Sequence, residues 1–203
     1  RGHCARLTRT DSSAGWAAQV ACPIASSQCH CELSRGSYAQ QMNESLPEHV
    51  AENRRYWDGM ADEWVAPGER AWEQEAAWGE WQIPNTEMPL LADDMHGLRA
   101  IELGCGTGYV SAWMQRRGAS VYAIDNSAAQ LATARRLSEL HRLDDIEWVH
   151  GNAEQVAQPD GSFDFAISEY GAAIWCEPAT WITEAHRLLR PGGELVFLGN
   201  HPL

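Results

Sequence analysis

Three glycines and a carboxylate stand at alternate positions in the run Glu102-Leu103-Gly104-Cys105-Gly106-Thr107-Gly108. The apolar residues that lead into it predict a short buried strand over 98–103, and residues 109–114 after it predict the start of a helix. A glycine-rich turn between a strand and a helix lets a ligand approach the backbone closely, because glycine has no side chain. The free N–H groups at the helix start would point at that ligand. The run therefore indicates a nucleotide-type cofactor site, and the alternative is an ordinary tight turn.

The spacing of the glycines separates two cofactor classes. The dinucleotide fingerprint G-x-G-x-x-G would place its third glycine at position 109, which is Tyr109. The pattern E-x-G-x-G-x-G instead resembles motif I of the class I S-adenosylmethionine (SAM)-dependent methyltransferases. The resemblance implies that the loop surrounds the methionine end of SAM, while Glu102 supports the loop and the amino group of the cofactor. The loop residues expected at this end are Gly104, Cys105, Gly106 and Gly108.

A second carboxylate follows at the end of the next predicted strand. Residues 120–124 alternate in polarity and end in Asp125, about 20 residues beyond the glycine loop, where nucleotide-binding folds hold ribose hydroxyls. Ser127 is a good N-cap for the helix predicted over 128–141, so Asp125 is not needed as a cap. We therefore expect Asp125 to bind the ribose, with Asn126 beside it.

The third predicted strand, residues 146–150, leads into Gly151-Asn152-Ala153. In the methyltransferase family an acidic or amide residue at this strand end contacts the adenine amino group, and the next backbone N–H reaches a ring nitrogen. The resemblance gives these two roles to Asn152 and Ala153. Many relatives carry Asp at the first position, but an amide oxygen still accepts a hydrogen bond.

Candidates for chemistry on the acceptor follow the fourth predicted strand. The turn Ser162-Phe163-Asp164 resembles the family's entry to this strand, and we expect Ser168, near the strand's end, on the cofactor side. Glu169 and Tyr170 come next and are the candidate catalytic residues, with His201 as a third candidate for a base. Glu169 is chemically the best base, although it could equally position the cofactor or remain solvated.

The order of elements predicts an α/β fold with a doubly wound, mostly parallel, Rossmann-like sheet. A helix predicted over 181–189 runs into Leu188-Leu189-Arg190-Pro191-Gly192-Gly193, which is similar to the family's post-motif signature, and residues 194–198 form the fifth strand. The resemblance covers residues 99–198. A complete sheet in this family has seven strands, so we expect the last two to be missing, the fifth strand to have a bare edge, and the chain to be a fragment.

Three segments are expected. Residues 1–41 lack sustained periodicity and are expected to be disordered or a non-native extension, with Met42 as the natural start. Residues 42–95 are expected to form an N-terminal helical lid, and residues 96–203 an incomplete SAM-binding domain. Cys29-His30-Cys31 does not have the spacing of zinc modules, so no metal site is expected.

The lid segment is rich in tryptophan. A helix is expected to start with Ser45 as its cap, and a second helix is expected over 69–78. We expect two or three of the five tryptophans in this segment to pack in the core and one or two to line the acceptor pocket. These five are Trp57, Trp64, Trp72, Trp78 and Trp81.

Composition limits the classes of partner. The net charge is −13, and all 15 basic residues are arginine. Such an acidic chain disfavours nucleic acid, which is bound through clustered basic side chains. No apolar run approaches the roughly 18–20 residues that span a membrane. A cytoplasmic protein is expected, and the sequence does not indicate its oligomeric state.

The resemblance is strongest to the small-molecule branch of the family that includes ubiquinone- and menaquinone-type enzymes. It implies SAM-dependent methyl transfer to a small-molecule acceptor by in-line displacement, with most of the catalysis coming from alignment of the two reactants. Two alternatives stay open: a SAM-binding protein without turnover, and a nicotinamide-dependent oxidoreductase on a similar fold.

Overall fold

The computed structural model describes residues 2–10, 15–18 and 46–200. The expectations for Cys29-His30-Cys31, Met42, Ser45 and His201 lie outside these residues.

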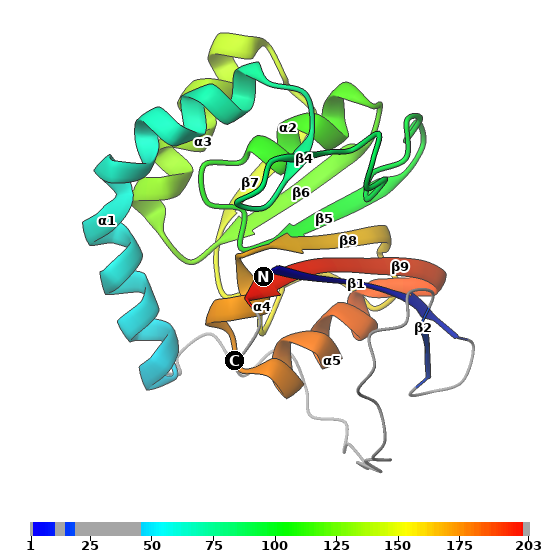
Figure 1. Cartoon of the computed structure of the whole chain (residues 1–203). Coiled ribbons are helices and arrows are strands. Elements are labelled where there is room, and N and C mark those ends of the chain that lie inside the picture. Colours follow the sequence, from blue (N-terminus) through cyan, green and yellow to red (C-terminus); the bar gives the residue numbers. More distant parts are fainter. Residues whose placement is uncertain (1, 11–14, 19–45, 201–203) are drawn as a thin grey trace.

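A seven-stranded sheet forms the centre of the molecule (Figure 1). Its strand order is β2-β1-β9-β8-β5-β6-β7, and the five strands from β5 to β9 run parallel. The parallel strands are β5 (Arg99–Leu103), β6 (Ser120–Asp125), β7 (Ile146–His150), β8 (Phe163–Glu169) and β9 (Leu189–Asn200). The expected Rossmann-like α/β sheet is therefore confirmed.

The expected bare edge of the fifth strand is wrong. Strand β1 (Gly2–Arg9) lies antiparallel along β9, in a register that runs from Gly2 opposite Asn200 to Thr8 opposite Glu194. The short strand β2 (Trp16–Ala18) pairs antiparallel with β1. The described parts of residues 1–41 thus belong to the domain. Because β1 pairs with β9, the backbone N–H and C=O groups along this edge of β9 have hydrogen-bond partners.

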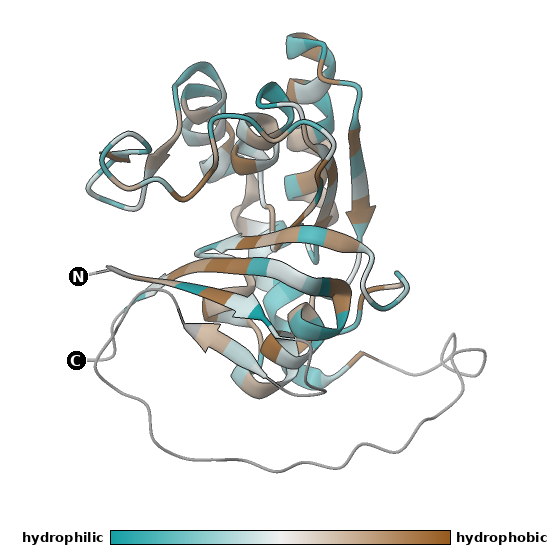
Figure 2. Cartoon of the chain, turned by 90° about the vertical axis from the view of Figure 1, so that its right-hand side faces the viewer, coloured by the Kyte–Doolittle hydropathy of each residue, from teal (hydrophilic) through white to brown (hydrophobic). Residues whose placement is uncertain are grey.

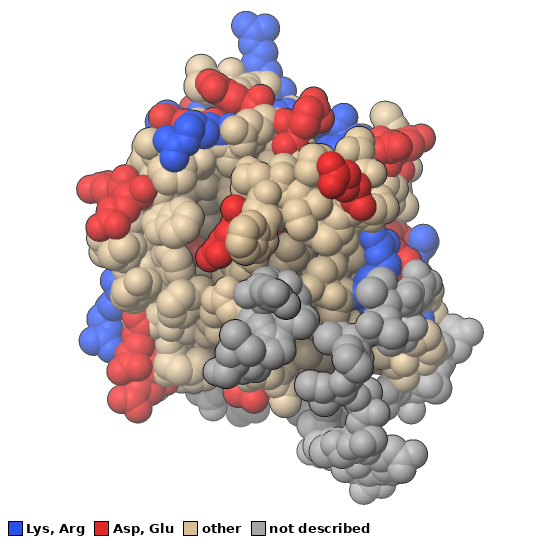
Figure 3. Space-filling model, in the orientation of Figure 1, with Lys and Arg blue, Asp and Glu red and all other residues tan. Residues whose placement is uncertain are grey.

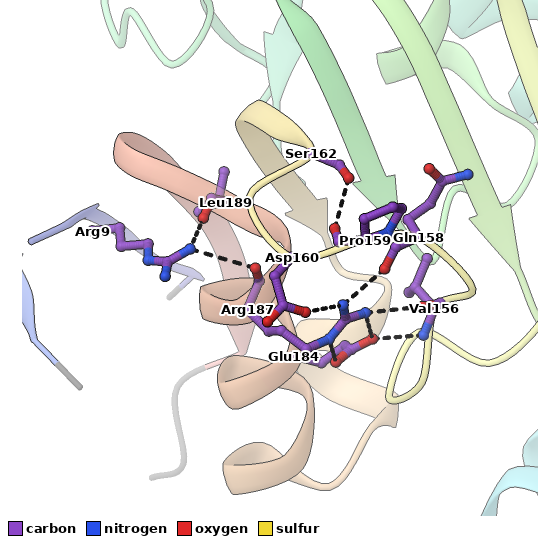
Figure 4. Close-up of polar contacts among 9 residues, drawn as sticks. All are labelled: Arg9, Val156, Gln158, Pro159, Asp160, Ser162, Glu184, Arg187 and Leu189. Atoms are coloured by element: carbon purple, nitrogen blue, oxygen red, sulfur yellow. Dashed lines mark hydrogen bonds and ion pairs between the residues drawn. The ribbon is translucent and has the colours of Figure 1, made fainter. Parts of the chain in front are cut away.

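Arginines fasten this N-terminal hairpin to the domain. The Arg6 guanidinium forms an ion pair of 2.6 Å with Glu194 and donates to the carbonyls of Pro89 and Leu90 at 2.8 and 3.1 Å. Arg9 donates to the carbonyl of Leu189, at the start of β9 (Figure 4). These contacts join residues more than 80 positions apart, so no local pattern in residues 1–41 reports them.

Helices cover both faces of the sheet (Figure 1). Helices α1 (Glu48–Glu73), α2 (Tyr109–Arg116) and α3 (Ala128–His141) lie on one face, and α4 (Ala172–Trp175) and α5 (Pro178–Leu188) lie on the other. A small hairpin of β3 (Ala77–Trp78) and β4 (Ile83–Pro84) follows α1. Hydrophobic residues recur along the strands (Figure 2), and the buried ones form two clusters with residues of the helices. The sheet therefore has a core on each side.

The expected pair of lid helices is one continuous helix, α1. Pro67 lies inside it, although a proline there removes one backbone hydrogen bond. Contacts with the glycine-loop region offset this loss: the buried Trp72 indole donates to the carbonyl of Thr107 at 2.7 Å, and Gly68 lies against the Thr107 side chain. Trp78, expected at the end of a second helix, is instead buried in strand β3.

Arg187 on α5 organises the connection between β7 and β8 (Figure 4). Its guanidinium pairs with Glu184 through two hydrogen bonds of 2.7 Å and reaches Asp160 at 2.8 Å. It also donates to the carbonyls of Val156 and Gln158 at 2.9 and 2.8 Å. One side chain thereby holds the loop that leads into β8, the strand that ends at Glu169.

Among the described residues, no helix combines the length and the apolar character that crossing a membrane requires. The cytoplasmic location stays a prediction.

Candidate active site

A cavity opens at the carboxyl ends of β5, β6, β7 and β8, and α1 forms one of its walls. This edge of an open parallel sheet is where such folds bind ligands. The residues predicted to bind the cofactor that line this cavity are Glu102, Gly104, Cys105, Gly106, Asp125, Asn126, Asn152 and Ala153. Both candidate catalytic residues, Glu169 and Tyr170, line it as well. The predicted residues, which range from Glu102 to Tyr170 in the chain, therefore meet at one cavity.

The glycines of the loop have different surroundings. All three have positive φ, which side chains rarely adopt. A Cβ atom on Gly104 would meet the backbone nitrogen of Ala172 at 2.6 Å, so this glycine lets the loop pack on α4. A Cβ atom on Gly106 would have no neighbour within 4 Å. Gly106 therefore leaves room at the cavity for a ligand, as the sequence motif predicts.

Two predicted cofactor residues do not line the cavity. Gly108 caps helix α2 and packs against Trp148. Ser168 is fully buried, donates to the carbonyl of Leu103 at 2.8 Å and accepts from the N–H of Ala173 at 3.1 Å. Both residues build the frame around the site. The Ser168 hydroxyl contacts α4 through the N–H of Ala173, on one face of the sheet, because successive side chains of a strand face opposite sides.

Asp125 links the ends of two strands. Its carboxylate accepts from the backbone N–H of Gly106 at 2.7 Å and from that of Ser127 at 2.8 Å. Burial raises the pKa of this carboxyl group above its usual value. Each carboxylate oxygen can accept a further hydrogen bond, so Asp125 keeps acceptor capacity for ribose hydroxyls.

Glu102 is buried at the floor of the cavity. Its carboxylate accepts from the backbone N–H of Ser111 at 2.8 Å and from the Ser111 hydroxyl. Burial raises the pKa of Glu102 well above its usual range, and the nearby Glu169 and Asp125 add to that effect. Glu102 therefore anchors the first turn of α2 to the end of β5, and its role toward the cofactor stays a prediction.

Asn126 and Asn152, which follow strands β6 and β7, form hydrogen bonds with other residues of the chain. The Asn126 side chain donates to the carbonyl of Val50 at 2.7 Å and accepts from Arg54 at 3.0 Å, which ties α1 to the end of β6. The Asn152 side chain accepts from the N–H of Glu154 at 3.0 Å. Asn152 and the buried Ala153 both line this end of the cavity.

Glu169 joins three parts of the site. Its carboxylate accepts from the backbone N–H of Gly79 at 2.9 Å and from the hydroxyl of Tyr109. Burial raises the pKa of Glu169, while the hydrogen bond from Tyr109 lowers it. Tyr170 beside it has a φ of 52°, a conformation that costs a non-glycine residue energy and that clusters at functional sites.

Gln130 is a cavity residue that the sequence did not single out. It lies on α3 with 3% of its surface exposed, and its Oε1 atom is buried without a hydrogen-bond partner. A buried unpaired acceptor costs about 1–3 kcal/mol. Gln130 also lines the cavity, so a hydroxyl or amino donor of a nucleoside ligand that reaches this oxygen would remove that cost. Together with the open space at Gly106, this unpaired acceptor fits the group that the motifs imply. The only sequence signal was a polar residue in the first turns of a helix that follows a site carboxylate.

Tryptophans of the lid divide between core and cavity, as expected. Trp72 and Trp78 are fully buried, and Trp57 and Trp64 line the cavity. Trp81 is 72% exposed and lines no part of the cavity. Trp175 of α4 also lines it, a contribution that sequence reasoning did not assign.

No three His, Cys, Asp or Glu side chains within the described ranges are grouped as metal ligands.

Comparisons with known proteins converge on one family. Residues 101–197 match the family described as "Methyltransferase domain". The chain is 39% identical over 106 residues to a ubiquinone biosynthesis O-methyltransferase of Pseudomonas aeruginosa, covering 50% of this chain and 44% of that protein. It is 37% identical over 116 residues to a demethylmenaquinone methyltransferase of Clavibacter sepedonicus, covering 57% and 45%. The chain thus spans less than half the length of these curated relatives.

A solved structure that aligns with a larger share of this chain has the same fold. Geranyl diphosphate C-methyltransferase from Streptomyces coelicolor superimposes with a TM-score of 0.61, over 76% of this chain and 66% of that one. The sequence identity is 17%, so this likeness concerns the fold alone.

Proposed function

Because residues 101–197 form a class I SAM-dependent methyltransferase domain, we propose that the protein transfers a methyl group from SAM to a small-molecule acceptor. SAM is the methyl donor of this family, and when bound it supplies an electrophilic methyl group on a sulfonium sulfur. The acceptor's electron pair forms the new bond to the methyl carbon while the carbon–sulfur bond breaks. That bond's electron pair stays on sulfur, so the products are the methylated acceptor and S-adenosylhomocysteine.

The observation that carries this proposal is the meeting of three strand-end groups at one cavity. We assign the loop from Gly104 to Gly106 to the methionine end, Asp125 to the ribose hydroxyls, and Asn152 with Ala153 to the adenine. The unpaired Oε1 of Gln130 and the empty space beside Gly106 support a nucleoside ligand here.

Glu169 is our candidate for the group that removes a proton from the acceptor. It is a buried carboxylate at the end of β8 with a raised pKa, which makes it a stronger base than a solvated carboxylate. Tyr109 donates a hydrogen bond to it and holds it in place. We assign Tyr170, on the same loop, to contact with the acceptor.

The distribution of charged side chains on the surface also supports a small-molecule acceptor. On the face seen in Figure 3, arginine side chains are separated from one another by acidic and uncharged residues. Nucleic acid is bound through gathered basic side chains, so this arrangement supports a small acceptor over a phosphate backbone.

Calorimetry with SAM, S-adenosylhomocysteine and NAD tests the cofactor. We expect both sulfur ligands to bind and NAD not to bind, and NAD binding without SAM binding would overturn the proposal. Asp125→Asn should weaken binding at least about tenfold, or 1.4 kcal/mol, because the amide keeps one accepting oxygen where Gly106, Ser127 and the ribose hydroxyls need two. Asp62→Asn, on the exposed side of α1, is the matched control.

Turnover is tested by incubating the protein with SAM and a metabolite extract. Mass spectrometry should detect S-adenosylhomocysteine together with a product heavier by CH₂. Binding of SAM without either product would favour the alternative of a SAM-binding protein without turnover.

A further inference from the structure

Four aromatic side chains form a continuous surface beside the cavity, which we call the aromatic wall: Tyr56, Trp57, Trp64 and Trp175. Trp57 lies at its centre, with ring centroids 5.1 Å from Trp175 and 5.9 Å from Trp64. Tyr56 stacks on Trp175 at 5.6 Å. Three of the four, Trp57, Trp64 and Trp175, line the cavity. The wall therefore joins two elements, α1 and α4, that are more than 100 residues apart.

Three of the four side chains of the aromatic wall are exposed to solvent. Tyr56 is 50% exposed, Trp64 44% and Trp175 36%. Adjoining exposed aromatic rings on a soluble protein mark a binding surface, because each ring would gain free energy by leaving water.

Polar contacts hold the wall in place before any ligand arrives. The Asn53 side chain donates to the carbonyl of Trp175 at 2.6 Å, which ties α1 to α4. Arg54 reaches the carbonyl of Asn126 at 3.1 Å and so fixes the same part of α1 to β6. A surface that is already ordered loses less entropy when a rigid ligand stacks on it.

The charged side chains of the cavity are all acidic. Carboxylates line it at Glu102, Asp125, Glu154 and Glu169, and the described lining residues include no Arg, Lys or His. Two basic groups beside the cavity are engaged: His49 lies 2.8 Å from Glu154, and Arg54 is bound to Asn126. An acceptor with a carboxylate or phosphate would find no basic partner among these lining residues, and each lining carboxyl group that is ionised would repel it.

From the wall and this charge pattern we propose that the methyl acceptor is a planar aromatic molecule, neutral or cationic, that packs against Trp57 and Trp175, whose ring planes lie at 87° to each other, so that it meets one ring face-on and the other edge-on. This inference rests on the proposed function and gives its substrate class. The aromatic wall recognises the ring, and the acidic lining excludes negatively charged analogues of the same shape.

Three probes of one shape test it: tryptophol, tryptamine and indole-3-acetate, which are neutral, cationic and anionic at pH 7. Calorimetry is carried out on the protein saturated with S-adenosylhomocysteine. We expect tryptophol and tryptamine to bind and indole-3-acetate to bind at least tenfold more weakly. Equal or tighter binding of indole-3-acetate overturns the inference, and so does failure of both other probes to bind.

Substitutions locate the ring site. Trp57→Ala and Trp175→Ala should each weaken tryptophol binding at least fivefold, and Trp57→Phe should retain most of it. Trp81→Ala is the matched control, since Trp81 is exposed and lies outside the cavity. Retained S-adenosylhomocysteine binding shows that each variant is folded. If both alanine variants bind tryptophol as the wild type does, the inference is wrong while the proposed cofactor site stands. If the wild type does not bind S-adenosylhomocysteine, the proposed function itself fails.

Discussion

The indole of Trp148 lies so close to Gly108 that a Cβ atom at that position would come within 2.3 Å of its Cη2 atom. Trp148 belongs to β7 and Gly108 caps helix α2, so the third glycine of the motif is required by packing between elements. Gly106, two residues earlier, has open space in the direction of its missing side chain. Within one sequence motif, Gly108 therefore allows two elements to pack together, and Gly106 leaves open space at the cavity.

Alanine substitutions at Gly108 and Gly106 should separate an effect on the free energy of unfolding from an effect on ligand binding. Gly108→Ala combines a positive φ with a clash and should lower the free energy of unfolding by about 3 kcal/mol or more. Gly106→Ala should cost about 1–2 kcal/mol for its φ alone but weaken S-adenosylhomocysteine binding about tenfold or more, because its methyl group enters the cavity. Thermal unfolding and calorimetry measure the two effects. Equal loss of stability in both variants would contradict this division.

Gln130→Met should make the free protein more stable and its cofactor site weaker. Methionine removes the buried unpaired acceptor, a gain of about 1–3 kcal/mol in unfolding free energy. The lost hydrogen bond to the nucleoside should reduce S-adenosylhomocysteine affinity about threefold to tenfold, which corresponds to 0.5–1.5 kcal/mol. Gln74→Met, at the exposed end of α1, is the control. Unchanged affinity of Gln130→Met would show that Gln130 does not contact the ligand.

Glu102→Gln should alter the pH dependence of stability. Burial raises the pKa of Glu102 in the folded protein, so the folded state holds its proton to higher pH than the unfolded state does. The wild type therefore loses stability as pH rises from the usual carboxyl range through the folded pKa, by about 1.4 kcal/mol for each unit of the difference. The variant lacks this loss. In denaturant unfolding between pH 5 and 8, its stability relative to wild type should rise with pH.

Glu139→Gln on the exposed side of α3 is the control for that experiment and should show no such trend. A Glu102→Gln variant that becomes less stable relative to wild type with rising pH would mean that the fold stabilises the ionised carboxylate.

Arg6→Ala should detach the N-terminal strand from β9. It removes the 2.6 Å ion pair with Glu194 and two hydrogen bonds to carbonyls. Since hydrogen bonds to charged groups contribute about 1.5–3 kcal/mol, we expect a loss of about 2 kcal/mol in unfolding free energy. Hydrogen exchange at the backbone N–H groups of β9 should also become faster. Arg55→Ala, an exposed change on α1, should have neither effect, and a similar result for both variants would show that β1 is not held by Arg6.

Glu169→Gln and Tyr109→Phe test the proposed base. Removal of a general base typically costs about 10²–10⁴ in rate, so Glu169→Gln should lower kcat by at least about 100-fold and flatten its rise with pH. The hydrogen bond from Tyr109 lowers the pKa of Glu169, so Tyr109→Phe should move that rise to higher pH. A pH profile that neither variant alters would assign Glu169 to positioning. Both variants should bind S-adenosylhomocysteine, which shows that the site is intact.

Much of the cofactor half of the site could be predicted because its signals are local. The glycine run reports a strand-to-helix turn with room at the backbone, and Asp125 and Asn152 follow strands whose ends meet at one edge of a parallel sheet. These relationships depend on neighbours along the chain and on the regular geometry of βα units. For this reason the parallel sheet could be predicted. Eight of the ten predicted cofactor residues line the cavity for the same reason.

The remaining features depend on contacts between distant parts of the chain, which no local pattern reports. Residues 1–41 show no sustained periodicity, so only the pairing of β1 with β9, almost 200 residues away, shows that β1 belongs to the sheet. Helix α1 continues past Pro67 because Trp72 is buried against the glycine loop. The unpaired Gln130 and the joining of Trp57 to Trp175 are likewise properties of packing. The amino-acid sequence by itself determined the fold class and the cofactor chemistry, and the tertiary structure alone decided which other side chains line the cavity.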